Sequence, residues 1–251
     1  MQKIISLVPS QTELLYDLGL DDEVIGITKF CVHPEKWFRT KTRIGGTKTI
    51  DVEKLISLKP DLVIANKEEN VKEQIEVLQK FTQVYVSDIK NLNDALNMII
   101  EVGKLVNKAP KAQELVEEIK LRFAELEQFI QTKIRAAYFI WRNPYMAPGG
   151  DTFINDMMEY CGLINIFKNQ NRYPEINIEE LKVHDCKILF LSSEPFPFKQ
   201  KHIDELQPLL EGIKILFVDG EMFSWYGSRL LLAVKYFRKL IQDVHSIVDK
   251  G

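Results

Sequence analysis

Val52-Glu-Lys-Leu55 followed by Asp61-Leu-Val-Ile-Ala65 is a pattern that the chain shows twice. The second copy is Ile178-Glu-Glu-Leu181 followed by Lys187-Ile-Leu-Phe-Leu191, and both parts of the match keep the same offset. In each copy an amphipathic stretch leads into a short apolar run, which is typical of a helix followed by a buried parallel strand. The shared offset predicts two similar α/β lobes.

The same alternation extends along the rest of the chain. Further strands are expected at Lys3–Val8, Glu23–Ile27, Val84–Val86, Ala136–Trp141 and Leu216–Val218. Ser10-Gln-Thr-Glu13 fits a capping box and Gly19 stands where a helix C-cap is expected, so a helix should follow the first strand. Strands that alternate with helices imply α/β architecture with mainly parallel sheets.

The middle of the chain contains no strand-like run. Helical spacing extends from Leu92 to Gly103, and a second helix is expected from Lys111 to about Gln131. At ~1.5 Å rise per residue that helix is about 30 Å long, and its central place favours a rigid connection between lobes over an ordinary packed helix. We expect an N-terminal lobe at 1–90, linking helices at 91–133 and a C-terminal lobe at 134–251.

Composition narrows the class of protein. The 251 residues are 45% hydrophobic and 27% charged, which excludes disordered, collagen-like and coiled-coil chains. Because 33 Lys and Arg face 36 Asp and Glu, the net charge of −3 gives no attraction to nucleic acid or to an anionic membrane. The three cysteines, Cys31, Cys161 and Cys186, are too few and too scattered for a disulfide framework or a zinc site.

The start of the chain leaves the compartment open. Its apolar run Ile4–Val8 is short and ends at Pro9, unlike a secretory signal. No run approaches the ~20 apolar residues of a spanning helix. We expect a periplasmic or cell-envelope protein if an export signal was omitted, and a cytoplasmic one otherwise.

Aromatic side chains are concentrated in the loops that follow the expected strands. Ligands bind outside the carboxyl ends of strands in open parallel sheets. These loops contain Phe30, Trp141, Tyr145, Phe196, Phe198, Phe223, Trp225 and Tyr226. Although aromatic residues usually belong to the core, such a group at a cleft suits a large, flat, partly apolar ligand.

Three polar residues in the same loops have two interpretations each. The neutral imidazole of His33 could contact a ligand or its metal centre, with a structural role equally open. The guanidinium of Arg142 or Arg229 could hold a carboxylate, phosphate or amide oxygen, while a surface salt bridge is the commoner outcome. The other histidines, His184, His202 and His245, are interpreted as surface residues.

Motifs for catalysis are weak. Gly45-Gly46 lacks the GxGxxG and Walker spacings, Ser10 lacks the GxSxG elbow, and no HExxH is present. The sequence therefore predicts no enzyme, no catalytic residue, no metal site and no cofactor. Two alternatives stay open: an enzyme that acts on a cofactor-like small molecule with facing groups such as His33 and Glu194, or a cytoplasmic ligand sensor.

Several stretches resemble the helical-backbone (class III) substrate-binding proteins of bacterial ABC importers. They are Ile4–Glu13, Gly45-Gly46, Ile50–Glu53, Leu58–Ala65, Ala147–Asn155 and Cys161–Phe167. Within that family the chain is most similar to cobalamin-binding members, followed by haem- and ferric-siderophore-binding members. The resemblance implies two α/β lobes joined by a long helix, a ligand cleft between the lobes, no chemistry on the ligand, and delivery to an ABC permease in the membrane.

Together, the loops and the resemblance give a set of expected contact residues. The predicted ligand-binding residues are Phe30, His33, Gly46, Asn66, Trp141, Arg142, Tyr145, Phe167, Phe196, Trp225, Tyr226 and Arg229. The resemblance implies permease docking at Glu73 and Glu205. We expect a monomeric, non-enzymatic protein that binds cobalamin or a related corrinoid, with a ferric siderophore or haem as the alternative ligand.

Overall fold

The computed structural model describes residues 1–131 and 133–248. The chain groups into two compact units. Unit 1 comprises Met1–Ile89, Asn93–Glu118 and Trp225–Leu230, and unit 2 comprises Lys90–Leu92, Ile119–Ser224 and the described part of 231–251. Among the described residues, no helix is both long and apolar enough to cross a membrane.

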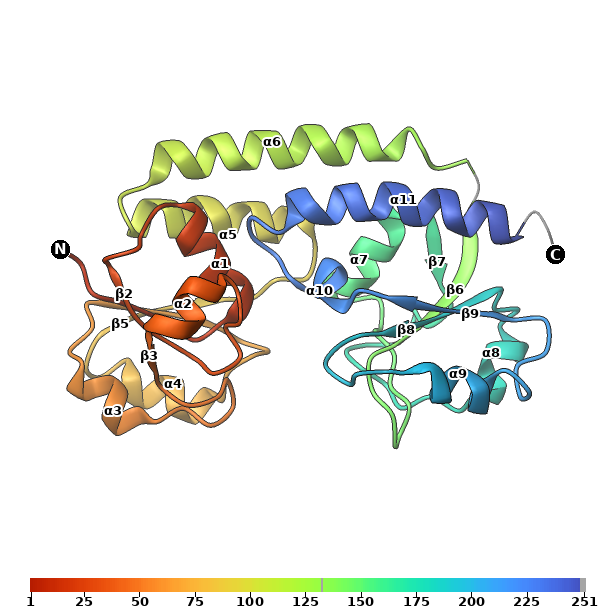
Figure 1. Cartoon of the computed structure of the whole chain (residues 1–251), viewed down its shortest axis with the longest axis horizontal. Helices are drawn as coiled ribbons and strands as arrows, with labels where there is room; N and C mark the ends of the chain where they lie inside the picture. The colour runs from red at the N-terminus through yellow and green to blue at the C-terminus, as the bar shows by residue number, and fades with distance from the viewer. Residues whose placement is uncertain (132, 249–251) are drawn as a thin grey trace. The chain divides into compact units, whose positions relative to one another are not determined.

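Unit 1 is built on a parallel sheet of five strands. They are β1 (Ile4–Ser6), β2 (Val24–Ile27), β3 (Thr42–Arg43), β4 (Leu62–Asn66) and β5 (Gln83–Ser87), in the order β3-β2-β1-β4-β5. Helices α3 (Val52–Ser57) and α4 (Lys72–Leu78) pack on one face through an apolar cluster that includes Leu55, Val63 and Ile75. On the other side of the sheet lie α1 (Pro9–Asp17) and α5 (Leu92–Leu105), while α2 (Glu35–Thr40) follows β2 in the chain (Figure 1).

Unit 2 is built on a parallel sheet of four strands. They are β6 (Ile134–Phe139), β7 (Leu163–Asn165), β8 (Ile188–Ser192) and β9 (Lys214–Val218), in the order β7-β6-β8-β9. Helices α8 (Glu179–Val183) and α9 (Gln200–Leu206) lie on one side of the sheet (Figure 1). On the other side lie α7 (Phe153–Tyr160) and α11 (Leu230–Val248), with the short α10 (Gly220–Ser224) between β9 and α11 in the chain.

The repeated sequence pattern occupies equivalent places in the two sheets. Its first copy becomes α3 and β4, and its second copy becomes α8 and β8. Each of these strands pairs with the first strand of its own sheet and with the strand that follows it, so β2-β1-β4-β5 corresponds to β7-β6-β8-β9. The predicted fold class of two α/β lobes with parallel sheets is therefore confirmed. The short edge strand β3 and strand β7 were not expected, because neither is a long apolar run.

The start of α1 differs from the sequence prediction. Val8 occupies the N-cap in an extended conformation and gives no side-chain cap, so the predicted capping box is wrong. The Thr12 hydroxyl donates to the Val8 carbonyl at 2.9 Å. Gly19 does have the left-handed conformation expected after the helix, with φ of +83°.

The central helix α6 spans Ala109–Glu127, which is shorter than expected at its carboxyl end. Its residues up to Glu118 group with unit 1 and those from Ile119 group with unit 2. The grouping divides the expected linking segment 91–133 between the two units, and it places Trp225–Leu230 of the expected C-terminal range 134–251 in unit 1. Residue 132 of the expected linking segment and residues 249–251 of the expected C-terminal lobe lie outside the described residues.

Candidate functional site

Phe30 and Gly46 lie together at the carboxyl end of the unit 1 sheet. Phe30 follows β2 and is 50% exposed, and the ammonium of Lys29 lies 5.1 Å from the centre of its ring. A Cβ atom at Gly46 would lie 3.1 Å from the Phe30 ring. Glycine at this position therefore lets the aromatic ring lie directly on the backbone of the loop after β3.

His33 and Trp225 form an edge-to-face ring pair in the same unit. Their ring centres are 5.6 Å apart at an angle of 72°. The guanidinium carbon of Arg229 lies 4.6 Å from the centre of the Trp225 ring. Two aromatic rings and one guanidinium, predicted separately, thus form a continuous group.

The Arg229 guanidinium is held by Glu13 from α1. Its Nε donates to Oε2 at 2.7 Å and its Nη2 donates to Oε1 at 2.7 Å. Arg229 is 6% exposed and the Glu13 side chain is 15% exposed, so the pair is nearly removed from water. This bidentate arrangement neutralises the arginine that the sequence offered as a ligand contact. Glu13 was missed because 216 positions separate the partners and no local pattern joins them.

Tyr226 is a buried neighbour in the same segment. Burial, and then the nearby carboxylates of Glu69 and Glu68, raise the pKa of Tyr226 well above its usual value. The phenol therefore stays protonated throughout the physiological range and can donate a hydrogen bond.

Asn66, a predicted ligand contact, anchors the loop after β4. It is 2% exposed. Its Oδ1 accepts hydrogen bonds from the backbone N–H groups of Glu68 and Glu69, and its Nδ2 donates to the Ser87 carbonyl. These bonds use the amide to shape the turn after β4.

The aromatic group of unit 2 rests on its core. Trp141 is 41% exposed and its ring centre lies 5.9 Å from that of Phe196. Phe196 in turn contacts Phe198 at 4.8 Å, and Tyr145 stacks on Phe139 at 5.0 Å. Apolar packing therefore presents Trp141 at the surface of this unit.

Arg142 is paired with Glu205 of α9, the residue predicted to dock the permease. The side chains are 25% and 47% exposed, respectively. A hydrogen bond with Tyr145, and after it the field of Glu205, raise the pKa of Arg142. The second docking candidate, Glu73, is exposed in the first turn of α4.

Two residues of unit 2 are more deeply placed than predicted. Phe167, a predicted ligand contact, is 1% exposed and belongs to the apolar core. His202 is buried, so its interpretation as a surface residue is wrong. Its Nδ1 accepts from the Lys199 N–H at 2.8 Å, and its ring packs against Phe196 and Phe198.

An acidic cavity lies at the carboxyl ends of β8 and β9. The sequence patterns did not predict that its lining residues come together. Its volume is about 600 Å³, and its lining includes Glu194, Asp219 and Glu221, with Ser193 and Tyr236. The lining contains three carboxylates and no basic side chain. The sequence could have indicated this cavity, because these acids lie in the loops that follow two neighbouring strands.

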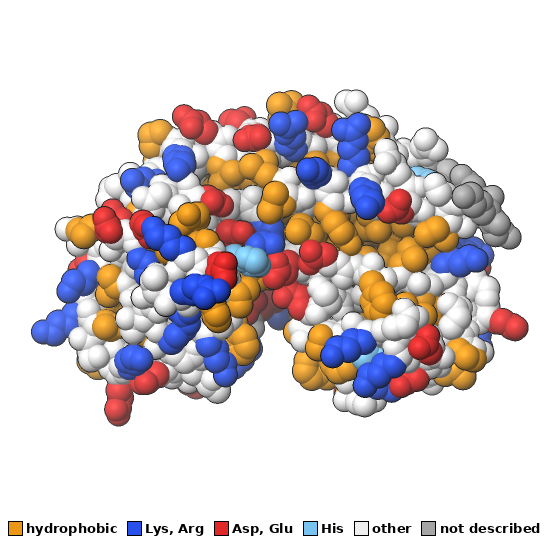
Figure 2. Space-filling view, viewed as in Figure 1, with side chains coloured by type: hydrophobic (Ala, Val, Ile, Leu, Met, Phe, Trp, Pro, Cys, Tyr) orange, Lys and Arg blue, Asp and Glu red, His pale blue; other side chains and the backbone are white. Residues whose placement is uncertain are grey.

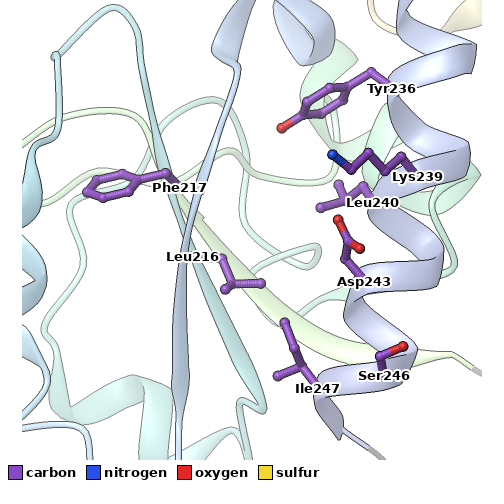
Figure 3. A pocket seen from close by; sticks show the side chains of 8 residues that line it. All are labelled: Leu216, Phe217, Tyr236, Lys239, Leu240, Asp243, Ser246 and Ile247. Carbon is purple, nitrogen blue, oxygen red and sulfur yellow. The ribbon is translucent and has the colours of Figure 1, made fainter.

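A further cavity lies between α11 and the edge strand β9. Figure 2 shows a band of apolar side chains on unit 2 below α11, where Figure 3 places this cavity of about 370 Å³. Leu216 faces Leu240 and Ile247, with Lys239 and Asp243 beside them. None of the predicted ligand-binding residues lines it. Across the described residues, no group of three or more His, Cys, Asp or Glu side chains could hold a metal ion.

Known proteins share this architecture. A periplasmic vitamin B12 binding protein of Vibrio cholerae has a TM-score of 0.81 with 23% identity, covering 96% of this chain and 98% of that one. A periplasmic heme binding protein of Pseudomonas aeruginosa has a TM-score of 0.83 with 16% identity, covering 96% and 92%. At these identities the likeness shows the fold.

Sequence relatives agree with the structural ones. A vitamin B12-binding protein of Vibrio campbellii is 28% identical over 195 residues, which are 76% of this chain and 70% of the relative. Another from Vibrio vulnificus is 25% identical over 247 residues, which are 94% and 88%. The family described as "Periplasmic binding protein" matches residues 4–214, and since that range is most of the chain, this protein belongs to the periplasmic binding protein family.

Proposed function

We propose that this protein captures cobalamin or a related corrinoid and delivers it to the membrane permease of an ABC importer. The family membership and the relatives named as vitamin B12-binding proteins support this proposal. The protein then acts in the periplasm or cell envelope and releases its ligand chemically unchanged.

The observation that carries the choice of ligand is the combination of exposed rings with arginines that are already paired. Phe30 and Trp141 offer apolar surface at the carboxyl ends of their own sheets. Arg229 is bound by Glu13, and Arg142 is bound by Glu205. Such surfaces suit a large flat ligand whose periphery is made of uncharged amides, as in a corrinoid.

Haem fits the charges less well. Its two carboxylates would have to displace Glu13 or Glu205, or lie beside the acidic lining of Glu194, Asp219 and Glu221. Displacing Glu13 would leave a nearly buried carboxylate unpaired, and the acidic lining would place like charges together, and both cost free energy. The metal would enter within its chelate, because the described residues provide no cluster for a bare ion.

The test is a tryptophan-fluorescence titration with cobalamin, cobinamide, haem and a ferric siderophore, backed by calorimetry. We expect saturable one-to-one binding of the corrinoids with micromolar or tighter affinity, and recovery of the ligand with an unchanged absorption spectrum. If haem binds and the corrinoids do not, the corrinoid proposal is wrong and the ligand is an anionic chelate. Conversion of the ligand would support the enzyme alternative.

Glu73 and Glu205 are the proposed docking acids. Glu73 lies on α4 of unit 1 and Glu205 lies on α9 of unit 2, and both carboxylates reach the surface. Replacing Glu73 with Lys should abolish ligand-stimulated ATP hydrolysis by the reconstituted transporter while the Kd for the corrinoid stays unchanged. Full stimulation by this variant would remove Glu73 from the docking surface.

A further inference from the structure

A nearly buried ion pair ties α1 to the segment Trp225–Leu230 within unit 1. The two hydrogen bonds of Arg229 to Glu13, each 2.7 Å long, fix the plane of the guanidinium. Removing two charges from water is costly, so such a pair is weak evidence for stability by itself. Its geometric effect is stronger, because a guanidinium held at Nε and Nη2 cannot turn about its side chain.

The fixed guanidinium supports an aromatic ring. Its carbon lies 4.6 Å from the centre of the Trp225 ring, and that ring meets His33 edge to face at 5.6 Å. The order of contact is therefore Glu13, Arg229, Trp225 and His33. Glu13 supplies the carboxylate at one end of this series, and Trp225 and His33 at the other end are predicted ligand contacts.

The backbone of the segment also lies directly on α1. Gly227 has a φ of +109°, and a Cβ atom there would lie 3.3 Å from both the Ser10 carbonyl oxygen and the Leu14 Cβ atom. Helix α1 therefore supports the segment by close contact and by charge, and only the charged contact reaches the Trp225 ring through Arg229.

We infer that Glu13 is a positioning residue for ligand capture, which orients the His33–Trp225 ring pair through Arg229. This inference rests on the proposed function, since it assigns the two rings to the ligand surface. Glu13 itself does not have to touch the ligand. The competing interpretation is that Arg229 binds the ligand directly and Glu13 merely neutralises it in the free protein.

Glu13→Gln separates these interpretations because they predict opposite signs. If Arg229 binds the ligand itself, removing the competing carboxylate frees the guanidinium, and affinity for cobalamin stays the same or rises. If Arg229 acts through the rings, the guanidinium loses its anchor and Kd rises by about tenfold. Asp17→Asn is the matched control, because it removes one exposed carboxylate from the same helix, four positions later.

Ring orientation is read independently of affinity by fluorine NMR of protein labelled with 5-fluorotryptophan. The chain has three tryptophans, and Trp225→Phe assigns one of the three signals. We expect Glu13→Gln to shift or broaden the Trp225 signal while the other two stay in place, and Asp17→Asn to move none. An unmoved Trp225 signal, or a Kd within twofold of the wild-type value, overturns the inference.

A second variant covers the case in which Glu13→Gln does not fold. The double replacement Glu13→Gln and Arg229→Met removes both charges, so it leaves no buried charge unpaired. It should fold, lose the characteristic Trp225 signal and still bind cobalamin about tenfold more weakly. Wild-type protein that binds no corrinoid would defeat the proposed function, while the NMR comparison would still test whether Glu13 sets the ring.

Discussion

The two units hold their aromatic rings by different physical means, and Trp225 is 7% exposed whereas Trp141 is 41% exposed. In unit 1, the Trp225 ring lies against a guanidinium that a nearly buried carboxylate holds in place. In unit 2, Trp141 rests on Phe196, which packs on the apolar core, and its neighbouring ion pair is partly exposed. The same strand order therefore does not fix how a binding surface is held: charge orients the rings of unit 1 and core packing orients those of unit 2.

Removing a core ring should break the unit 2 arrangement most severely. Phe167→Ala leaves a cavity in the cluster on which Phe196 and Tyr145 pack, and should lower the free energy of unfolding by about 3–5 kcal/mol. Urea denaturation measures this loss. Phe81→Ala in unit 1 is the control, because Phe81 is 62% exposed and its removal should cost little. Equal losses in the two variants would contradict the core assignment.

Trp225→Ala should have the largest effect on ligand binding. It removes the ring that joins Arg229 to His33, and we expect cobalamin binding to weaken by about 2 kcal/mol. Calorimetry measures the Kd, and far-ultraviolet circular dichroism checks that the variant is folded. A Kd equal to that of the wild type would remove Trp225 from the site.

The sequence could predict much of each sheet but little of how each surface is held. Strands such as β4 and β8 are short apolar runs in a repeated pattern, and their burial follows from local composition. The sequence placed Trp141 in a loop at the end of a buried strand, and its ring is indeed exposed there. The same reasoning could not distinguish Phe167 from Trp141, because an aromatic side chain in a loop can point into the core as well as toward solvent.

Long-range pairing was the part that local patterns could not reveal. Glu13 fitted a capping box, yet its carboxylate binds Arg229 near the other end of the sequence. Asn66 stands at a ligand-facing position along the chain, but its amide is used by the turn that follows it. In both cases the decisive partner depends on tertiary structure and not on neighbouring residues.

The partly exposed ion pair of unit 2 should be worth much less than its counterpart in unit 1. Glu205→Gln leaves Arg142 able to reach water, so we expect a loss of stability of at most about 1 kcal/mol, which shrinks further at high salt. Glu13→Gln leaves a nearly buried guanidinium and should cost roughly 3 kcal/mol or more, with little salt dependence. Urea denaturation at low and high salt compares the two. Similar losses would show that burial does not distinguish these pairs.

The smallest expected effect is a pH dependence confined to unit 2. Burial lowers the pKa of His202 below its ordinary value of 6.5, and the positive charges of Arg142 and Lys201 act in the same direction against Glu205. The folded protein therefore binds fewer protons at this site than the unfolded chain does. Its contribution to stability is complete above about pH 6.5 and is lost as the pH falls below that value.

His202→Asn tests that pH dependence with little change in structure, because an amide oxygen can replace Nδ1 as the acceptor for the Lys199 N–H. Unfolding by urea at about pH 7.5 and about pH 5.5 should show a smaller loss on acidification for this variant than for the wild type. His245→Asn on α11 controls for the removal of a histidine and should behave as the wild type does. If His202→Asn loses as much stability on acidification as the wild type, another group causes the effect. The difference between the units would then lie in their ion pairs and core packing alone, since the buried imidazole beneath Phe196 would add no sensitivity to acid.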